Sequence, residues 1–245
     1  MNPKFENFRQ DARHSGIGSA VRWKREELWG MLGHDLRTPL NGIQGFLDLL
    51  SGTRLDSEQQ EFVETAQECT ESLRSILDGI IECTRIESGQ LFVSTQAADV
   101  RELVASVLHQ HGLQANHLGI ELKAEIPSDF PRVLSLDKGK LRQILTNLVG
   151  NAVKFTRTGR VIVRVNHFQS GLIFEVIDTG IGIPTDQIPS VFEAFYQCDR
   201  NDGQSLQGVG LGLAIVKKLV ATLGGEIEMT SERDCGTTVT FRLPS

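Results

Sequence analysis

Apolar side chains in the first third of the chain recur at alternating steps of four and three residues. One series runs through Leu36, Leu40, Ile43, Leu47 and Leu50. A second runs through Phe62, Ala66, Cys69, Leu73, Ile76, Ile80 and Cys83. This spacing places one apolar stripe along a helix, like the seam of a coiled coil. It predicts two long helices, over about residues 20–50 and 57–88.

Local signals indicate where these helices end. Ser51-Gly52-Thr53 breaks the first helix, and Ser57 with Gln60 three residues later is typical of a capping box at the start of the second. Two long helices joined by a short loop form an antiparallel hairpin. One hairpin cannot bury both its seam and the further apolar residues Phe46, Val63, Leu77 and Ile81. Two hairpins paired in a four-helix bundle can do so, which predicts a homodimer.

After residue 90 the pattern changes to alternating helices and strands. Helices are predicted from Asp99 to about His111 and over residues 138–154 and 212–223, and strands over 120–126, 160–165, 172–177, 226–230 and 237–243. The fold class is therefore α+β: a helical hairpin followed by an α/β sandwich in which helices cover one face of the sheet. The predicted boundaries are 1–19 for a flexible lead-in, 20–90 for the hairpin and 91–245 for the α/β domain.

Composition narrows the functional classes. The chain is 40% hydrophobic and 23% charged, with a net charge of −6, so we expect a packed core. There is no basic stripe, which argues against nucleic acid as a partner. No apolar run is long enough to span a membrane, no signal peptide is evident, and the four cysteines lack metal-type spacing. We expect a cytoplasmic location, as a whole protein or as the cytoplasmic part of a membrane-anchored sensor.

A candidate nucleophile lies in the first helix. His34 is about 200° around the helix from Leu32 and from Leu36, so its ring should point to solvent. A hydrogen bond from the ring to Asp35 would leave the other ring nitrogen nucleophilic. Pro39 cannot donate to the carbonyl of Asp35, so we expect the helix to bend at residues 34–35. Thr38, four residues after His34, shares its outer face.

A second candidate site combines a polar helix face with glycine-rich loops. Asn147, Asn151 and Lys154 are spaced i, i+4 and i+7 and share one helix face. An Asn151 oxygen could bind a hard cation and Lys154 a phosphate, although a polar face on a surface helix has the same spacing. Asp178 ends an apolar strand before Gly180 and Gly182. Its carboxylate could accept the amino group of adenine.

The third part of this site is the segment Gly208-Val209-Gly210-Leu211-Gly212-Leu213, which opens a helix. The amides at a helix N-terminus favour phosphate. Phe192 to Tyr196 and a polar stretch, 197–207, precede it, and this polar stretch is typical of a mobile lid. No G-x-x-x-x-G-K-[S/T] loop is present, which argues against a P-loop nucleotide site.

In combination, these motifs resemble those of sensor histidine kinases of two-component systems. Residues 34–42 resemble the H box, with an Asn41-Gly42 pair similar to the hybrid branch of the family. Residues 147–155 resemble the N box, 178–182 the G1 box, 192–195 the F box, 208–213 the G2 box, and 224–225 with 236–238 the last strand pair. The resemblance implies a Bergerat-type ATP-binding fold for residues 91–245.

The resemblance also implies roles for individual residues. His34 would accept the phosphoryl group of ATP beside Asp35, and Thr38 would position a water for a phosphatase activity. Asn151 would hold Mg²⁺, Asp178 would bind adenine, and Lys154, Gly210 and Gly212 would hold the phosphates. The remaining implied nucleotide contacts are Asn147, Phe155, Gly180, Gly182, Phe195, Gly208, Leu211 and Thr238. The implied partners are a second copy of the chain, a response-regulator receiver domain and a histidine phosphotransfer protein.

Two alternatives stay open at this point. Bergerat ATPases of the chaperone, gyrase or mismatch-repair kind carry a water-activating glutamate where this chain has Asn147, and an amide cannot act as a general base. A kinase-like regulator would bind nucleotide and modulate another histidine kinase. The lid motif bears on the second alternative, because Gln207 and Val209 replace a glycine and a threonine that are common in the family.

Overall fold

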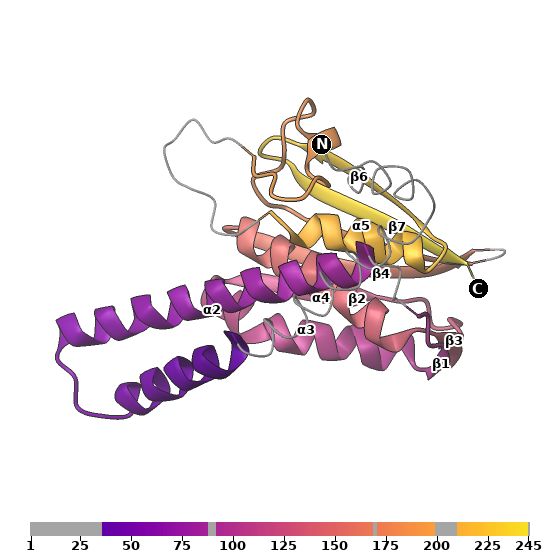
Figure 1. Ribbon diagram of the computed structural model, residues 1–245. Coiled ribbons are helices and arrows are strands. Elements are labelled where there is room, and N and C mark those ends of the chain that lie inside the picture. The colour runs from indigo at the N-terminus through magenta and orange to yellow at the C-terminus, as the bar shows by residue number, and fades with distance from the viewer. Residues whose placement is uncertain (1–35, 88–91, 169–170, 199–209, 245) are drawn as a thin grey trace, which may run out of the picture. The chain divides into compact units, whose positions relative to one another are not determined.

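The computed structural model describes residues 36–87, 92–168, 171–198 and 210–244. The chain divides into two compact units, residues 1–90 and residues 91–245 (Figure 1). In the described residues, no helix is both long enough and apolar enough to cross a membrane.

The first unit contains a pair of antiparallel helices, one helical over residues 36–51 and the other α2 (Ser57–Glu87) (Figure 1). Contacts at both ends of the pair establish the direction. Arg37 forms an ion pair with Asp78 at 2.6 Å, and Gln67 Nε2 donates to Asp48 Oδ1 at 3.1 Å. The predicted hairpin is therefore present.

The capping box of α2 lies one residue earlier than predicted. The Asp56 carboxylate accepts from the Gln59 amide at 2.8 Å, and the Asp56 amide donates to Gln59 Oε1 at 3.2 Å. The assignment to Ser57 and Gln60 is therefore wrong. Because α2 begins at Ser57, Asp56 occupies the N-cap position, where a carboxylate also interacts favourably with the helix dipole.

Contact between the two helices buries a different stripe from the predicted seam. Leu40, Leu77 and Ile81 form a buried cluster, and Val63 is buried as well. Several residues of the predicted seam are instead 45% to 62% exposed in the single chain, namely Leu36, Ile43, Leu50, Phe62 and Leu73. Val63, Leu77 and Ile81, which the sequence analysis placed outside the seam, thus make most of the contact within the hairpin. Much of the seam faces outward.

The second unit is built on a five-stranded mixed sheet with the order β2-β4-β5-β7-β6. Its strands are β2 (Ile120–Glu125), β4 (Gly159–Phe168), β5 (Gly171–Asp178), β6 (Glu226–Glu232) and β7 (Gly236–Pro244). β2 and β4 are parallel and the other neighbours are antiparallel. All five predicted strands are present.

Three helices cover one face of this sheet: α3 (Val100–His117), α4 (Lys138–Phe155) and α5 (Gly212–Thr222) (Figure 1). Beneath them, the Phe174 and Phe241 rings stack with centroids 4.7 Å apart. α3 continues past its predicted end at His111, because Gly112 is accommodated within the helix. The helix stops at Gly119 instead, which has a left-handed φ of +68°.

A two-stranded sheet in this unit was missed by the sequence analysis. β1 (Gln96–Ala98) pairs antiparallel with β3 (Leu134–Leu136), and a short 3-10 helix, η3, spans Ile188–Ser190. Strands of three residues are too short to show a period. The pairing nevertheless matters, because it joins the beginning of the second unit to the segment that leads into α4.

Candidate nucleotide-binding site

The polar face of α4 meets the first turn of α5. A Cβ atom added at Gly212 would lie 3.4 Å from Asn147 Oδ1 and 3.7 Å from Asn151 Nδ2. Asn147 Nδ2 donates to the Gln143 carbonyl at 3.1 Å, which orients the amide. The opposite side of α4 is buried through residues such as Leu141 and Leu145. The predicted asparagine stripe and the third glycine of the G2 segment therefore come together.

Lys154 lies at the end of the same helix. Its ammonium is 5.2 Å from the centroid of the Phe155 ring, within the range of a cation–π contact. The residue as a whole is exposed, yet desolvation of the ammonium lowers the pKa of Lys154. A partly desolvated cation with room to move is well suited to a phosphate group.

Asp178 is held rigidly at the end of β5. Its Oδ1 accepts from the Gly180 amide at 2.8 Å and from the Thr237 amide at 3.2 Å. Burial raises the pKa of this carboxyl group, and the two amide hydrogen bonds only partly offset that effect. No described residue donates to Oδ2. One carboxylate oxygen is thus fixed by the protein, and the other can accept a donor from a ligand.

The loop after Asp178 is packed so tightly that its glycines are required. A Cβ atom at Gly180 would collide with the Phe155 carbonyl, and one at Gly182 with the Glu232 carbonyl. Gly182 also has a left-handed φ of +62°. The loop is therefore confined between the end of α4 and the turn that joins β6 to β7.

Replacing Gly182 with alanine should destabilise the second unit by about 2 kcal/mol or more, since both the positive φ and the collision oppose a side chain. Thermal unfolding followed by circular dichroism measures the effect. Gly112→Ala is the matched control, because a Cβ at Gly112 meets nothing within 4 Å and alanine favours the helix. Equal melting temperatures for Gly182→Ala and the wild type would contradict this packing.

The F-box and G2 segments contact each other across residues 199–209, which lie outside the described residues. The Phe195 amide donates to the Gly210 carbonyl at 2.9 Å, and both residues have a positive φ. A Cβ atom at Gly210 would collide with the Tyr196 carbonyl. Leu211 is buried at the N-terminus of α5. Gly208 and most of the expected lid belong to the part of the chain that is not described.

The described residues do not place every predicted residue in this site. His34 and Asp35 fall outside the described residues, and Thr38 is exposed on the first helix. Thr238 pairs with Ile177 and so faces away from Asp178. Thr237, one residue earlier, pairs with Asp178 and therefore lies on the same face of the sheet as that residue. Since neighbouring strand residues point to opposite faces, an offset of one residue moves the side chain across the sheet.

Ser231 was not anticipated. Its hydroxyl accepts from the Ile183 amide at 2.8 Å, donates to the Gly236 carbonyl at 2.9 Å, and lies 2.9 Å from Thr237 Oγ1. It thereby joins the β6–β7 hairpin to the loop after Asp178. The only signal in the sequence is a polar residue at an inward position of β6, after Ile227 and Met229.

Comparison with known protein families identifies both units. Residues 24–89 match the His Kinase A (phospho-acceptor) domain. Residues 136–245 match the family described as histidine kinase-, DNA gyrase B- and HSP90-like ATPase. The chain belongs to the sensor histidine kinases. The family resemblance and the predicted sequence of a helical region followed by an α/β ATPase domain are thus confirmed.

Individual relatives of this histidine kinase support the same family assignment. It is 39% identical over 219 residues to the sensory/regulatory protein RpfC of Xanthomonas campestris, covering 87% of this chain and 30% of RpfC. It is 37% identical over 214 residues to the aerobic respiration control sensor protein ArcB of Escherichia coli, covering 86% of this chain and 28% of ArcB. The chain therefore spans less than a third of the length of either relative.

Among solved structures, full-length ShkA in complex with AMPPNP matches this histidine kinase with a TM-score of 0.74 and 35% identity. The match covers 89% of this chain and 45% of ShkA. The histidine kinase AdeS of Acinetobacter baumannii, at 21% identity and a TM-score of 0.61, supports the fold alone.

Proposed function

We propose that this histidine kinase transfers the γ-phosphoryl group of ATP to His34 and then to an aspartate of a response-regulator receiver domain, in two-component signalling. The observation that carries the proposal is Asp178, whose Oδ1 is fixed by two amides while Oδ2 accepts from no described residue. This is the geometry needed to recognise the exocyclic amino group of adenine. The match of residues 24–89 to a phospho-acceptor domain and the AMPPNP complex of ShkA support it.

The nucleotide-binding residues divide by the part of ATP that they contact. Asp178 binds adenine, with Gly180 and Gly182 allowing the backbone to approach the base. Lys154 and the amides of Gly210 and Gly212 hold the phosphates, since these amides lie at the N-terminus of α5, an 11-residue helix whose dipole favours negative charge. Thr237 replaces Thr238 in this assignment. Its amide orients Asp178.

The donor groups at the site also suit Mg²⁺. Asn151, whose side-chain amide lies next to the first turn of α5, could supply a hard oxygen. Within the described residues, no group of three histidine, cysteine, aspartate or glutamate side chains could hold a metal ion. Mg²⁺ that accompanies ATP is typically bound by one or two protein oxygens together with phosphate oxygens, and a single asparagine fits that pattern. When bound, the ion neutralises phosphate charge.

The chemical step is an in-line displacement at the γ-phosphorus. A neutral ring nitrogen of His34 attacks, the bond to the β,γ-bridging oxygen breaks, and ADP leaves with that bond's electron pair. Asp35 accepts a hydrogen bond from the other ring N–H and stabilises the positive charge that develops on the imidazole. A receiver aspartate then attacks the phosphohistidine, and His34 returns to its neutral form. The H-box pattern and the matched phospho-acceptor domain support these roles.

The outward apolar stripe of the helical hairpin supports the assembly that the mechanism uses. Leu36, Ile43, Phe46 and Phe62 are exposed in the single chain. Pairing with a second copy would bury them in a four-helix bundle. We therefore propose a cytoplasmic homodimer. Its phosphoryl group passes to a receiver domain and, in a longer relay, to a histidine phosphotransfer protein.

Incubation with ATP labelled at the γ-phosphate tests the proposal. The expected result is a label on the protein that survives base, is lost in acid, and maps to His34 by mass spectrometry. An acid-stable label would indicate a different acceptor and contradict the proposal. Nucleotide binding with no label would favour the kinase-like regulator, the alternative suggested by Gln207 and Val209.

Thr38→Ala should separate a phosphatase activity from the kinase. Thr38 is exposed on the outer face of its helix, where it can position a water but does not contribute to ATP binding. Autophosphorylation should stay within about twofold, while dephosphorylation of the phosphorylated receiver falls on the order of tenfold or more. Thr65→Ala on α2, whose hydroxyl bonds only the Glu61 carbonyl, is the control. Equal loss of both activities would contradict the separation.

A further inference from the structure

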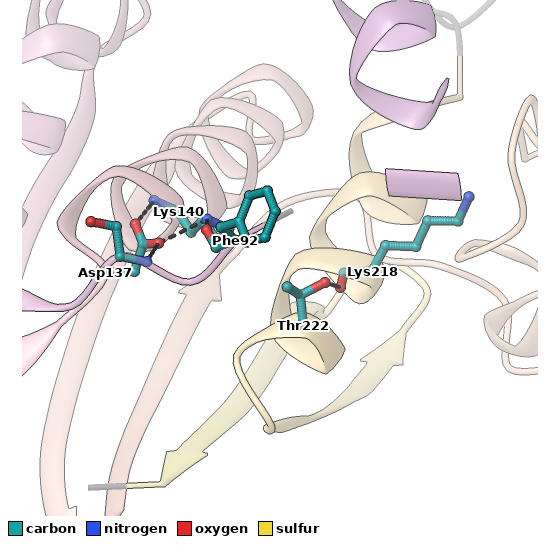
Figure 2. A network of polar contacts seen from close by, with 6 residues as sticks. Phe92, Asp137, Lys140, Lys218 and Thr222 are labelled. Atoms are coloured by element: carbon teal, nitrogen blue, oxygen red, sulfur yellow. Dashed lines mark hydrogen bonds and ion pairs between the residues drawn. The ribbon is translucent and has the colours of Figure 1, made fainter. Parts of the chain in front are cut away.

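The first described residues of the second unit are tied to the beginning of α4. Lys140 Nζ donates to the Phe92 carbonyl at 2.7 Å and to Asp137 Oδ2 at 2.8 Å. The Ser94 amide donates to the same Asp137 oxygen at 3.0 Å. Figure 2 shows Phe92, Asp137 and Lys140 meeting in this way. A single buried ion pair thus holds residues 92–94 against the helix.

This ion pair is well shielded for a pair of charges. The Asp137 side chain is 7% exposed and that of Lys140 is 12% exposed. Burial by itself would raise the pKa of Asp137, but hydrogen bonds from Lys140 and Ser94 outweigh it and hold the pKa below its usual range. Asp137 Oδ1 also accepts from the Lys140 amide at 3.0 Å and so caps α4. Both carboxylate oxygens of Asp137 therefore accept hydrogen bonds, and the Lys140 ammonium donates two.

Apolar packing contributes little to holding residues 92–94. The Phe92 side chain is 83% exposed and that of Val93 is also exposed. The attachment consists of the hydrogen bonds to Lys140 and Asp137, followed by the pairing of β1 with β3, in which Gln96 lies opposite Leu136. The polar contacts therefore determine where the chain first becomes attached to the second unit.

The ion pair lies where the chain enters the second unit, and this position links it to phosphoryl transfer. Residues 92–94 come directly after 88–91, where the chain passes from the helical unit to the second unit. Lys140 also shares a face of α4 with Asn147, since seven residues rotate a helix by about 700°, or nearly two full turns. Residues 92–94, which we call the connecting segment, are thus attached to the same face of α4 that carries the asparagine stripe.

We propose that Asp137 and Lys140 form a clamp that fixes the connecting segment to α4, and that both act as positioning residues for phosphoryl transfer from bound ATP to His34. The inference rests on the proposed function. Released from the clamp, the connection between the units lengthens, and the effective concentration of the γ-phosphate at His34 falls. Nucleotide affinity does not depend on the connection and should not change.

The double variant Asp137→Asn/Lys140→Met removes the clamp with little other damage. Asparagine still caps the helix, methionine keeps much of the apolar stem of lysine, and no unpaired charge is left buried. Lys140→Arg keeps a cation that can donate to both partners. Arg142→Met is the matched control, because it removes a cation on the same helix that donates to Ser106 Oγ at 2.7 Å on the surface.

Three measurements on the full chain test whether the clamp positions bound ATP for phosphoryl transfer. In the double variant, autophosphorylation should fall on the order of tenfold, nucleotide affinity should stay within about twofold, and the Ser94 amide should exchange hydrogen faster. Arg142→Met should resemble the wild type in all three. Lys140→Arg, which keeps a cation beside Asp137, should retain more of the phosphorylation rate and of the Ser94 protection than the double variant does. An unchanged phosphorylation rate, or a loss of nucleotide affinity equal to the loss of rate, would overturn the inference. A wild type that binds nucleotide without label would instead refute the proposed function, while Ser94 exchange would still report whether the clamp exists.

Discussion

Replacing His34 with glutamine should reduce phosphorylation of the chain by more than about a thousandfold, because an amide nitrogen is not a nucleophile. Nucleotide affinity should be unchanged, since the residues that we propose to bind ATP lie in the second unit. Glutamine has a size and hydrogen-bonding capacity close to those of histidine, so the helical hairpin should remain folded. Incorporation of γ-labelled phosphate and binding of a fluorescent ATP analogue, measured on the same preparation, separate the two effects.

The control for this variant is a second histidine of the chain. His109 lies on the surface of α3, outside the candidate site, and His109→Gln should keep the full label. A substantial label on His34→Gln would place the phosphoryl acceptor at another residue, and the proposed mechanism would fail. Loss of label together with loss of nucleotide affinity would indicate misfolding, which the circular dichroism spectrum reveals independently.

Replacing Asp178 with asparagine should weaken ATP binding on the order of a hundredfold. The amides of Gly180 and Thr237 hold Oδ1, so the asparagine carbonyl takes its place and the amide NH₂ group takes the place of Oδ2. The new NH₂ group and the amino group of adenine are both donors, so the hydrogen bond that Oδ2 accepted from adenine is lost. Loss of a charge-assisted hydrogen bond and burial of an unpaired donor together account for about 3 kcal/mol. Isothermal titration with a non-hydrolysable ATP analogue measures this effect.

Asp186→Asn supplies the comparison, because Asp186 is an exposed carboxylate a few residues further along the chain. It should bind nucleotide like the wild type. The pH dependence gives a second check. Burial raises the pKa of Asp178, so its neutral form accumulates at a higher pH than for an ordinary aspartate. Affinity should therefore decline as the pH falls through this raised value, and Asp178→Asn should lack that decline.

The parts of the fold that the sequence could predict are those with a long, regular period. β5 alternates between buried and half-buried residues along most of its length, and Val161, Val163 and Val165 of β4 are all buried. α4 combines a continuous buried face with the polar stripe of Asn147 and Asn151. Asp178 was found because it ends such a strand and precedes two glycines. In each case a local pattern and the overall packing favour the same structure.

Features that depend on a single residue or on distant contacts could not be predicted. Asp56 and Ser57 are both good N-cap residues, and only the folded helix shows which one caps it. Which of Thr237 and Thr238 lies on the same face as Asp178 depends on the pairing register of β5 with β7. The contact between Phe92 and Lys140 joins residues 48 apart in sequence through a backbone carbonyl, which carries no side-chain signal.

The position of β7 also constrains how the protein is made. β7 follows the other strands of the sheet in sequence, yet it lies between β5 and β6 in space. While a ribosome is still synthesising residues before Gly236, β5 and β6 therefore present unpaired edges, and Asp178 lacks the amide of Thr237. The nascent chain cannot complete its ATP site during translation of the earlier strands. We expect this unit to complete its sheet only after residues 236–244 have been synthesised, and to depend until then on protection of those edges.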